Sequence, residues 1–305
     1  MKVLVAGSQG QLARALVERG RSRHGLSIVA LGRPQLDLSD TSSIARVVAV
    51  EQPDLIINAA AYTAVDNAER ELKAAFAINR DGAGGLATAA REINAPIVHI
   101  STDYVFDGTK SSAYVETDAT CPIGVYGSSK LEGEAAVAAA NPKHLILRTS
   151  WLFSPYGHNF LKTMLRLAAE RPELRVVADQ FGNPTYAPDL ADAILDIAFR
   201  VVDSAFPPVW GIYHAAGTGD TSWHGFATEI VRATARTTVP KLSIVPIATA
   251  DYPTIARRPA NSLLNCDKLE LVFGTRLPPW QQSVGKCIES LGAGTPLADA
   301  DQFSS

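Results

Sequence analysis

The sequence has few cysteines. Of 305 residues only Cys121, Cys266 and Cys287 are cysteine, and they lie far apart along the chain. An odd number of widely spaced cysteines fits neither a disulfide framework nor a zinc knuckle, which needs pairs a few residues apart. Reduced thiols are typical of intracellular proteins, so we expect a cytoplasmic location and no structural metal.

The sequence also lacks an excess of either charge, because 28 Lys and Arg residues face 31 Asp and Glu residues, a net charge of −3. A nucleic-acid partner is not expected, since binding it needs many cations to neutralise phosphates. No apolar run is long enough to span a bilayer. The first residues are typical of a strand and a turn, and they lack the charged region, apolar region and cleavage site of a secretory signal peptide. We therefore expect small-molecule partners, and neither a membrane nor a nucleic acid.

Short apolar runs alternate with helical patterns through the first half of the chain. Fully apolar runs of this length are typical of strands buried on both faces of a parallel sheet. The expected strands are 2–6, 27–31, 55–59, 97–101 and 144–149, and the expected helices are 11–19, 41–51, 68–78, 85–93, 128–139 and 160–170. This alternation predicts an α/β fold with a Rossmann-type doubly wound parallel sheet.

Prolines at short intervals make the second half less regular. We expect residues 1–150 to form the dinucleotide-binding domain, with segments from about 186–210 returning to it. Residues 151–185 and 211–292 are expected to form a smaller α/β substrate-binding domain. Residues 293–305 have little apolar content and are expected to be a frayed tail.

Gly7 and Gly10 lie between the first expected strand and the first expected helix. In dinucleotide-binding folds, glycines at this junction permit a tight turn, and N–H groups at the start of the helix face the pyrophosphate. Glycines after a strand often serve the turn alone. The position of these two within a strand–turn–helix unit favours a nicotinamide cofactor.

The second expected strand ends in Gly32-Arg33 and has no acidic residue there. A carboxylate would bind the ribose hydroxyls of NAD, whereas an arginine pairs with the 2′-phosphate of NADP. The expected cofactor is therefore NADPH, with NADH as the alternative, and a solvated loop arginine is the other interpretation of Arg33. Asp37 and Leu38 are expected beside the adenine.

A catalytic group is predicted where Thr102 and Asp103 follow a strand and Tyr126 precedes Lys130 by four residues at the start of a helix. That spacing places the phenol and the amine on one helix face. A free tyrosine, with a pKa of about 10, exchanges protons poorly near neutrality, and a neighbouring ammonium favours the phenolate. Tyr126 is thus the expected proton carrier. Lys130 is expected to supply the charge and hold the cofactor ribose, and Thr102 to polarise the substrate carbonyl. Asp103 either tunes the tyrosine or is a structural carboxylate.

A more specific signal comes from six runs of the sequence: 58–66, 101–108, 125–134, 148–151, 179–185 and 256–262. These runs resemble the dTDP-4-dehydrorhamnose reductase family of the extended short-chain dehydrogenases, and the resemblance extends to about Gln281. It implies reduction of the C4 keto group of dTDP-4-dehydro-L-rhamnose to dTDP-L-rhamnose by hydride from NADPH. The product would feed a cell-wall polysaccharide or an O-antigen.

The resemblance also implies roles for single residues. Thr102, Tyr126 and Lys130 would form the catalytic triad. The cofactor contacts would come from Gly10, Gln11, Leu12, Ala61, Tyr62 and Thr63, and the sugar contacts from Asp103, Tyr104 and Trp151. The other interpretation of Trp151 is a core side chain. Arg257 and Arg258 are candidates for the substrate diphosphate, since a planar guanidinium suits phosphate oxygens.

The sequence departs from the family at a metal site. Some members bridge a dimer through Mg²⁺ held by glutamates, and the matching positions here are Ala15 and Pro188. Asp189 and Asp192 lie nearby and could substitute. We expect no Mg²⁺ requirement, and a chain that is a monomer or a homodimer.

Two alternative functions stay open. The first is another sugar-nucleotide 4-ketoreductase or an epimerase. A 4,6-dehydratase is disfavoured, because it needs an acid pair after the threonine and Tyr104 follows Asp103 here. The second is a non-catalytic nucleotide-binding subunit, which would have lost the tyrosine or the lysine.

Overall fold

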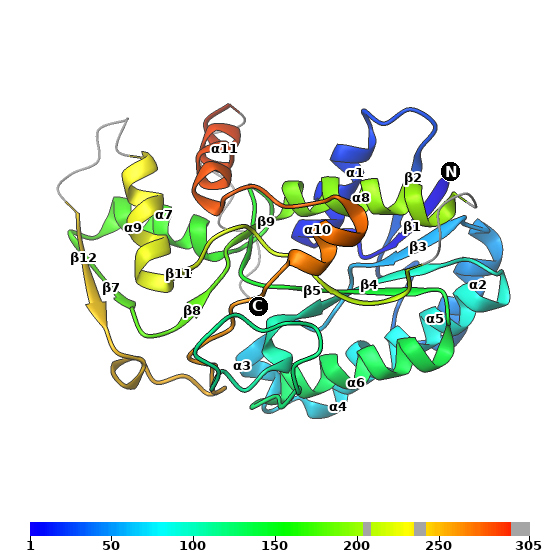
Figure 1. The fold of residues 1–305 in the computed structure, drawn as a ribbon, viewed down its shortest axis with the longest axis horizontal. Coiled ribbons are helices and arrows are strands. Elements are labelled where there is room, and N and C mark those ends of the chain that lie inside the picture. Colours follow the sequence, from blue (N-terminus) through cyan, green and yellow to red (C-terminus); the bar gives the residue numbers. More distant parts are fainter. Residues whose placement is uncertain (204–208, 235–241, 294–305) are drawn as a thin grey trace.

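A six-stranded sheet forms the centre of the larger part of the molecule (Figure 1). The computed structural model describes residues 1–203, 209–234 and 242–293. The strand order is β10-β5-β4-β3-β1-β2, and every pairing is parallel. The strands are β1 Lys2–Ala6, β2 Ser27–Leu31, β3 Leu55–Asn58, β4 Ile97–Thr102, β5 His144–Thr149 and β10 Gly211–His214. From β1 the chain adds β2 on one side of the sheet and then β3, β4 and β5 on the other. This reversal confirms the predicted doubly wound fold.

Helices cover both faces of this sheet because its strands are apolar on both sides (Figure 1). Val3 and Val5 of β1 pack with α1 Gln11–Gly20 and α8 Ala187–Val202. Leu4 packs on the opposite side with α2 Thr41–Glu51 and α5 Ala83–Glu92. Alternate residues of a strand point to opposite faces, so an unbroken apolar run demands two helical layers.

The segment after β3 differs from the single helix predicted over 68–78. It forms α3 Val65–Ala68, α4 Leu72–Phe76 and a π-helical turn, η1 Ala77–Gly82, that continues into α5. The turn brings Asn79 against α6 Val125–Ala140 at Gly133, where a Cβ would lie 2.0 Å from the Asn79 carbonyl oxygen. Apolar spacing at the α-helical period does not reveal an inserted π turn.

A smaller part of the molecule lies beyond the carboxyl ends of the main strands (Figure 1). Its apolar cluster joins α7 Phe160–Glu170, α9 Trp223–Thr234 and α11 Trp280–Ala293. Among the described residues, three two-stranded sheets complete it: β6 Leu152–Phe153 with β9 Thr185–Tyr186, β7 Glu173–Val177 with β12 Ser243–Ile247, and β8 Phe181–Gly182 with β11 Thr221–Ser222. Two short 3₁₀ turns lie at η2 Asp103–Val105 and η3 Thr249–Asp251.

The chain crosses between the two parts more than once. Besides α8, strand β10 and helix α10 Asp267–Phe273 pack with the main sheet, through side chains such as Tyr213 and Phe273. The predicted division into two domains stays a prediction, and residues 211–214 belong to the main sheet. Of the expected tail, residues 294–305 lie outside the described residues.

A buried ion pair holds α6 against the sheet. The guanidinium of Arg148 on β5 donates to Glu134 on α6 through Nε at 2.9 Å and Nη2 at 2.6 Å. The two side chains are only 2% and 4% exposed. Ser101 on β4 donates to the same carboxylate at 2.5 Å. The pair therefore fixes the helix that carries Tyr126 and Lys130 relative to two central strands.

We predict that Glu134→Ala lowers the free energy of unfolding by about 3–5 kcal/mol, because it leaves the Arg148 charge buried and unpaired. Urea denaturation measures the loss. The matched control is Glu170→Ala, which removes an exposed pair with Arg166 on α7 and should cost less than about 0.5 kcal/mol. Equal losses in the two variants would contradict the assignment.

Candidate active site

The predicted catalytic residues lie together at the carboxyl end of β4. Thr102 is the last residue of this strand, and Tyr126 and Lys130 lie one turn apart on α6. Burial raises the pKa of Tyr126 to about 12, although a hydrogen bond with Thr102 acts in the opposite direction. The phenol is therefore protonated at neutral pH, and the lowering of its pKa that the sequence led us to expect from the Lys130 ammonium is not found.

Lys130 is almost completely buried, with 2% of its surface exposed. Its Nζ donates to the Ile100 carbonyl oxygen at 2.5 Å and lies 3.4 Å from Nε2 of His99. Burial lowers the pKa of Lys130 to about 8, and the charge of Glu134 opposes this shift. The amine therefore changes protonation much closer to neutrality than an exposed lysine does.

Asp103 is buried beside Thr102 and begins the short turn η2. Its Oδ1 accepts a hydrogen bond from the Thr102 hydroxyl at 3.0 Å, whereas Oδ2 has no hydrogen-bond partner among the described residues. Burial raises the pKa of Asp103 to about 7, and the nearby hydroxyls of Ser262 and Thr102 act in the opposite direction. A carboxyl group that titrates near neutrality next to Tyr126 is the feature expected of a group that tunes an acid.

A narrow cavity opens beside the ring of Tyr126. The ring of Tyr104 meets that of Tyr126 edge-on, with centroids 5.9 Å apart. The cavity is lined by Val65, Glu69, Tyr104, Ile123, Gly124, Tyr126, Gly127, Ala256, Arg257 and Pro259. The structure thus brings two predicted substrate residues, Tyr104 and Arg257, to the phenol of Tyr126.

The second predicted arginine has a different environment. Arg258 pairs with Asp66 at 2.8 Å and also donates to the Ala256 carbonyl oxygen. Its guanidinium therefore ties the segment around Ala256 to α3, while Arg257 is exposed at the cavity. This long-range pair left no signal in the sequence.

The glycine turn has the geometry of a phosphate-binding loop. Gly7 has a φ of +105°, and its N–H donates to the Leu31 carbonyl oxygen at 2.7 Å. Gly10 precedes α1 without a side-chain cap, and a Cβ there would meet no atom within 4 Å. The first N–H groups of the helix are thus open to a pyrophosphate, and the residues present fit a dinucleotide.

The two residues after Gly10 use their side chains elsewhere. Gln11 donates to the Leu152 carbonyl oxygen and accepts hydrogen bonds from Ser154 and Asn159. Leu12 is 4% exposed and packs in the core. What these two residues can offer a phosphate is their backbone N–H groups at the start of α1.

The end of β2 lies against the glycine turn, because a Cβ on Gly32 would be 2.8 Å from the hydroxyl of Ser8. Arg33 follows as an exposed side chain. Asp37 accepts two hydrogen bonds from Ser39, which lower its pKa, and the charge of Arg33 acts in the same direction. Leu38 is 6% exposed and packs with α2, so its side chain belongs to the core.

The other predicted cofactor residues follow β3. The backbone N–H of Tyr62 donates to Oδ1 of Asn79 at 2.8 Å, and its phenol donates to Glu71. Asn79 also donates to the hydroxyl of Ser129 on α6. The loop that contains Ala61, Tyr62 and Thr63 is thereby fixed to the helix of the catalytic pair. A role for Asn79 was not predicted from the sequence, because its position depends on the π-helical turn η1.

Trp151 stacks on Trp223, with ring centroids 3.5 Å apart and an interplanar angle of 6°. Its φ is +44°, and Gly182 leaves room for the indole, since a Cβ there would lie 2.4 Å from it. The side chain is half-buried at the edge of the smaller apolar cluster. A sugar contact of Trp151 therefore stays a prediction. The stacking of Trp151 on Trp223 was not predicted, because no local sequence pattern indicates it.

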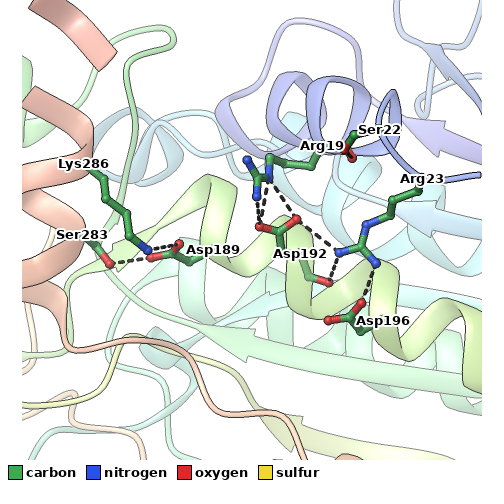
Figure 2. Close-up of polar contacts among 8 residues, drawn as sticks. All are labelled: Arg19, Ser22, Arg23, Asp189, Asp192, Asp196, Ser283 and Lys286. Atoms are coloured by element: carbon green, nitrogen blue, oxygen red, sulfur yellow. Dashed lines mark hydrogen bonds and ion pairs between the residues drawn. The ribbon is translucent and has the colours of Figure 1, made fainter. Parts of the chain in front are cut away.

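Asp189 and Asp192, the candidate substitutes for the family's metal ligands, and the neighbouring Asp196 all face cations (Figure 2). Asp192 accepts from Arg19 at 2.6 Å and from Arg23 at 3.2 Å, and Asp196 pairs with Arg23. Asp189 pairs with Lys286. Across residues 1–203, 209–234 and 242–293, no cluster of three or more His, Cys, Asp or Glu side chains could hold a metal ion. These pairs use the charges that an ion would need, and independence from Mg²⁺ stays a prediction.

Comparison with known proteins decides the family. The chain matches the RmlD substrate binding domain over residues 1–293. The chain belongs to this family. A dTDP-4-dehydrorhamnose reductase of Sinorhizobium fredii is 50% identical over 95% of this chain and 98% of its own length. The reductase of Escherichia coli K12 is 42% identical over 97% of this chain and 100% of its own length. The resemblance inferred from the sequence is thus confirmed.

Solved structures of this family have the same fold. A dTDP-4-dehydrorhamnose reductase from Clostridium acetobutylicum matches with a TM-score of 0.89 at 37% identity, covering 96% of this chain and all of its own. The Bacillus anthracis enzyme, in complex with NADP, matches with a TM-score of 0.87 at 36% identity, covering 95% of this chain and 99% of its own. A Thermus thermophilus UDP-glucose 4-epimerase, 18% identical, shares the fold with a TM-score of 0.80.

We predict that Arg33→Ala weakens NADPH binding by about ten- to hundredfold and leaves NADH binding nearly unchanged, because only NADPH has a 2′-phosphate to pair with. Fluorescence titration of both cofactors measures the two affinities. Arg21→Ala removes another exposed arginine at the far end of α1 and is the matched control. Equal weakening of both cofactors in Arg33→Ala would show that Arg33 has a structural role.

Proposed function

We propose that the chain reduces the C4 keto group of dTDP-4-dehydro-L-rhamnose to dTDP-L-rhamnose with hydride from NADPH. The observation that carries this proposal is the placement of the Tyr126 phenol beside Thr102, on the same helix as a buried Lys130. The 50% identity with a dTDP-4-dehydrorhamnose reductase over nearly the whole chain supports the choice of substrate.

The chemistry follows from the protonation states. Bound NADPH supplies the hydride to C4. Tyr126 gives its proton to the C4 oxygen as negative charge develops there, and its raised pKa ensures that the proton is present at pH 7. The Thr102 hydroxyl stabilises the same oxygen when it turns from Asp103 to the substrate. Lys130 holds the cofactor ribose and restores the proton to Tyr126.

Cofactor binding uses mainly backbone groups. We assign the pyrophosphate to Gly7, Gly10 and the first N–H groups of α1, and the 2′-phosphate to Arg33. Asp37 lies beside the adenine end, and residues 61–63 line the nicotinamide ribose. The complex of the Bacillus anthracis relative with NADP supports NADPH as the reductant.

Substrate recognition uses the cavity beside Tyr126. We assign the sugar to Asp103, Tyr104 and Trp151, and the diphosphate to Arg257. Arg258 acts through its ion pair with Asp66, which holds the neighbouring segment in place.

The alternatives fit the site less well. Tyr104 lies against Tyr126 where a dehydratase would place an acid. A non-catalytic subunit would not need a buried lysine behind an intact tyrosine.

No helix within the described ranges is long and apolar enough to cross a membrane. We propose that the chain acts in the cytoplasm, as a monomer or a homodimer, on a small-molecule sugar nucleotide.

We predict that Tyr126→Phe lowers kcat by about 10²- to 10⁴-fold, because the phenol proton is lost while the ring still packs. The assay follows NADPH oxidation on adding dTDP-4-dehydro-L-rhamnose, and NMR identifies the product. NADPH affinity should stay unchanged. In the control Tyr213→Phe, in which a residue of β10 loses a hydroxyl that donates to the Val209 carbonyl oxygen, turnover should persist. Wild-type turnover in Tyr126→Phe would exclude this acid, and no turnover by the wild type would exclude the proposed function.

A further inference from the structure

Two buried polar side chains lie behind Lys130 and have no part in the proposed reaction. Asn58 ends β3 and His99 lies in β4, and the two residues are register partners in the sheet. They are 1% and 0% exposed. Nδ2 of Asn58 lies 3.0 Å from Nδ1 of His99, and Nε2 of His99 lies 3.4 Å from Nζ of Lys130. These contacts form a continuous row from the sheet to the catalytic amine.

The partners of Asn58 decide which ring nitrogen of His99 carries the hydrogen. Oδ1 of Asn58 accepts a hydrogen bond from the backbone N–H of Ala60 at 3.3 Å, so the amide NH₂ group faces His99. Nδ1 of His99 is then the acceptor, and a neutral imidazole with an accepting Nδ1 carries its hydrogen on Nε2. Burial lowers the pKa of His99 well below its usual value, so the ring is neutral.

The Nε2–H group of His99 therefore faces the nitrogen of Lys130. An ammonium group has three hydrogens and no lone pair, so two donors would oppose each other across this contact. A neutral amine accepts from His99 with its lone pair and still donates to the Ile100 carbonyl oxygen. Burial, which lowers the pKa of Lys130 to about 8, acts in the same direction.

The other charged and titratable groups around Lys130 have partners of their own. Glu134, on the same helix, is paired with Arg148 of β5. Asp103 of η2 accepts from Thr102. On η1, Arg80 pairs with Asp81 and with Glu132 of α6 at the surface. The remaining groups are Tyr126 and Tyr104, both with a raised pKa, and His214 of β10, whose pKa burial lowers to about 3.

We propose that His99 is a positioning residue for Lys130: its Nε2–H, oriented by Asn58, donates to the Nζ lone pair and holds the neutral amine in place. The inference rests on the role of Lys130 in the proposed function. A lysine that gives its proton to the Tyr126 phenolate after reduction is left as the neutral amine. His99 stabilises that amine until solvent returns the proton.

The test uses the ligand-free protein and NMR. In the wild type, ¹⁵N shifts should show hydrogen on Nε2 of His99 and none on Nδ1, and Lys130 should titrate near pH 8. His99→Phe keeps a buried ring but removes the donor. The midpoint of Lys130 should then rise by about half a unit to one unit, as expected for the loss of one hydrogen bond to the neutral form.

Two further variants complete the design. Asn58→Asp presents only acceptors to Nδ1, so the hydrogen of His99 should move to Nδ1 and the Lys130 midpoint should rise. This variant keeps the test open if His99→Phe does not fold. The matched control is His144→Phe, which removes a histidine bonded to the Asn141 carbonyl oxygen at the start of β5 and should leave the midpoint unchanged.

Hydrogen on Nδ1 of His99 in the wild type would overturn the proposal. An unchanged Lys130 midpoint in both His99→Phe and Asn58→Asp would also overturn it. The readouts need neither cofactor nor substrate, so a failed reductase assay would contradict the proposed function alone.

Discussion

The site depends on one constraint, the burial of the Lys130 amine between α6 and the middle of the sheet. Burying an amine is costly unless polar partners meet it, and here the Ile100 carbonyl oxygen and His99 do so. The helix must therefore lie very close to its neighbours. Glycines on α6 permit this approach, since a Cβ on Gly127 or Gly133 would fall about 2 Å from a carbonyl oxygen of Tyr104 or Asn79.

The same burial sets the chemistry. Removal from water raises the pKa of the Tyr126 phenol and of the Asp103 carboxyl, and it lowers that of the Lys130 amine. The Tyr126 phenol keeps its proton at pH 7, whereas the nearby Lys130 amine loses one only slightly above that pH. This pair suits a reduction that consumes one proton at each turnover. The ion pair between Glu134 and Arg148 keeps this arrangement rigid by holding α6 on the sheet.

The fold and the placement of Tyr126 and Lys130 on one helix were predictable because local patterns encode them. Apolar runs marked five strands of the main sheet, and the spacing of Tyr126 and Lys130 placed both on one helix face. The sixth strand, β10, joins the sheet from beyond residue 210, and no local pattern identified it. Long-range contacts, such as Trp151 on Trp223 and Arg258 with Asp66, depend on the finished fold.

The central claim is direct hydride transfer to C4 of the sugar, with the proton from Tyr126. The most direct measurement uses NADPH deuterated at the transferred position of the nicotinamide ring, with dTDP-4-dehydro-L-rhamnose in ordinary water. The account predicts that NMR finds deuterium at C4 of the product, one atom for each NADPH oxidised. Deuterium at another ring carbon, or a product without deuterium, would contradict it.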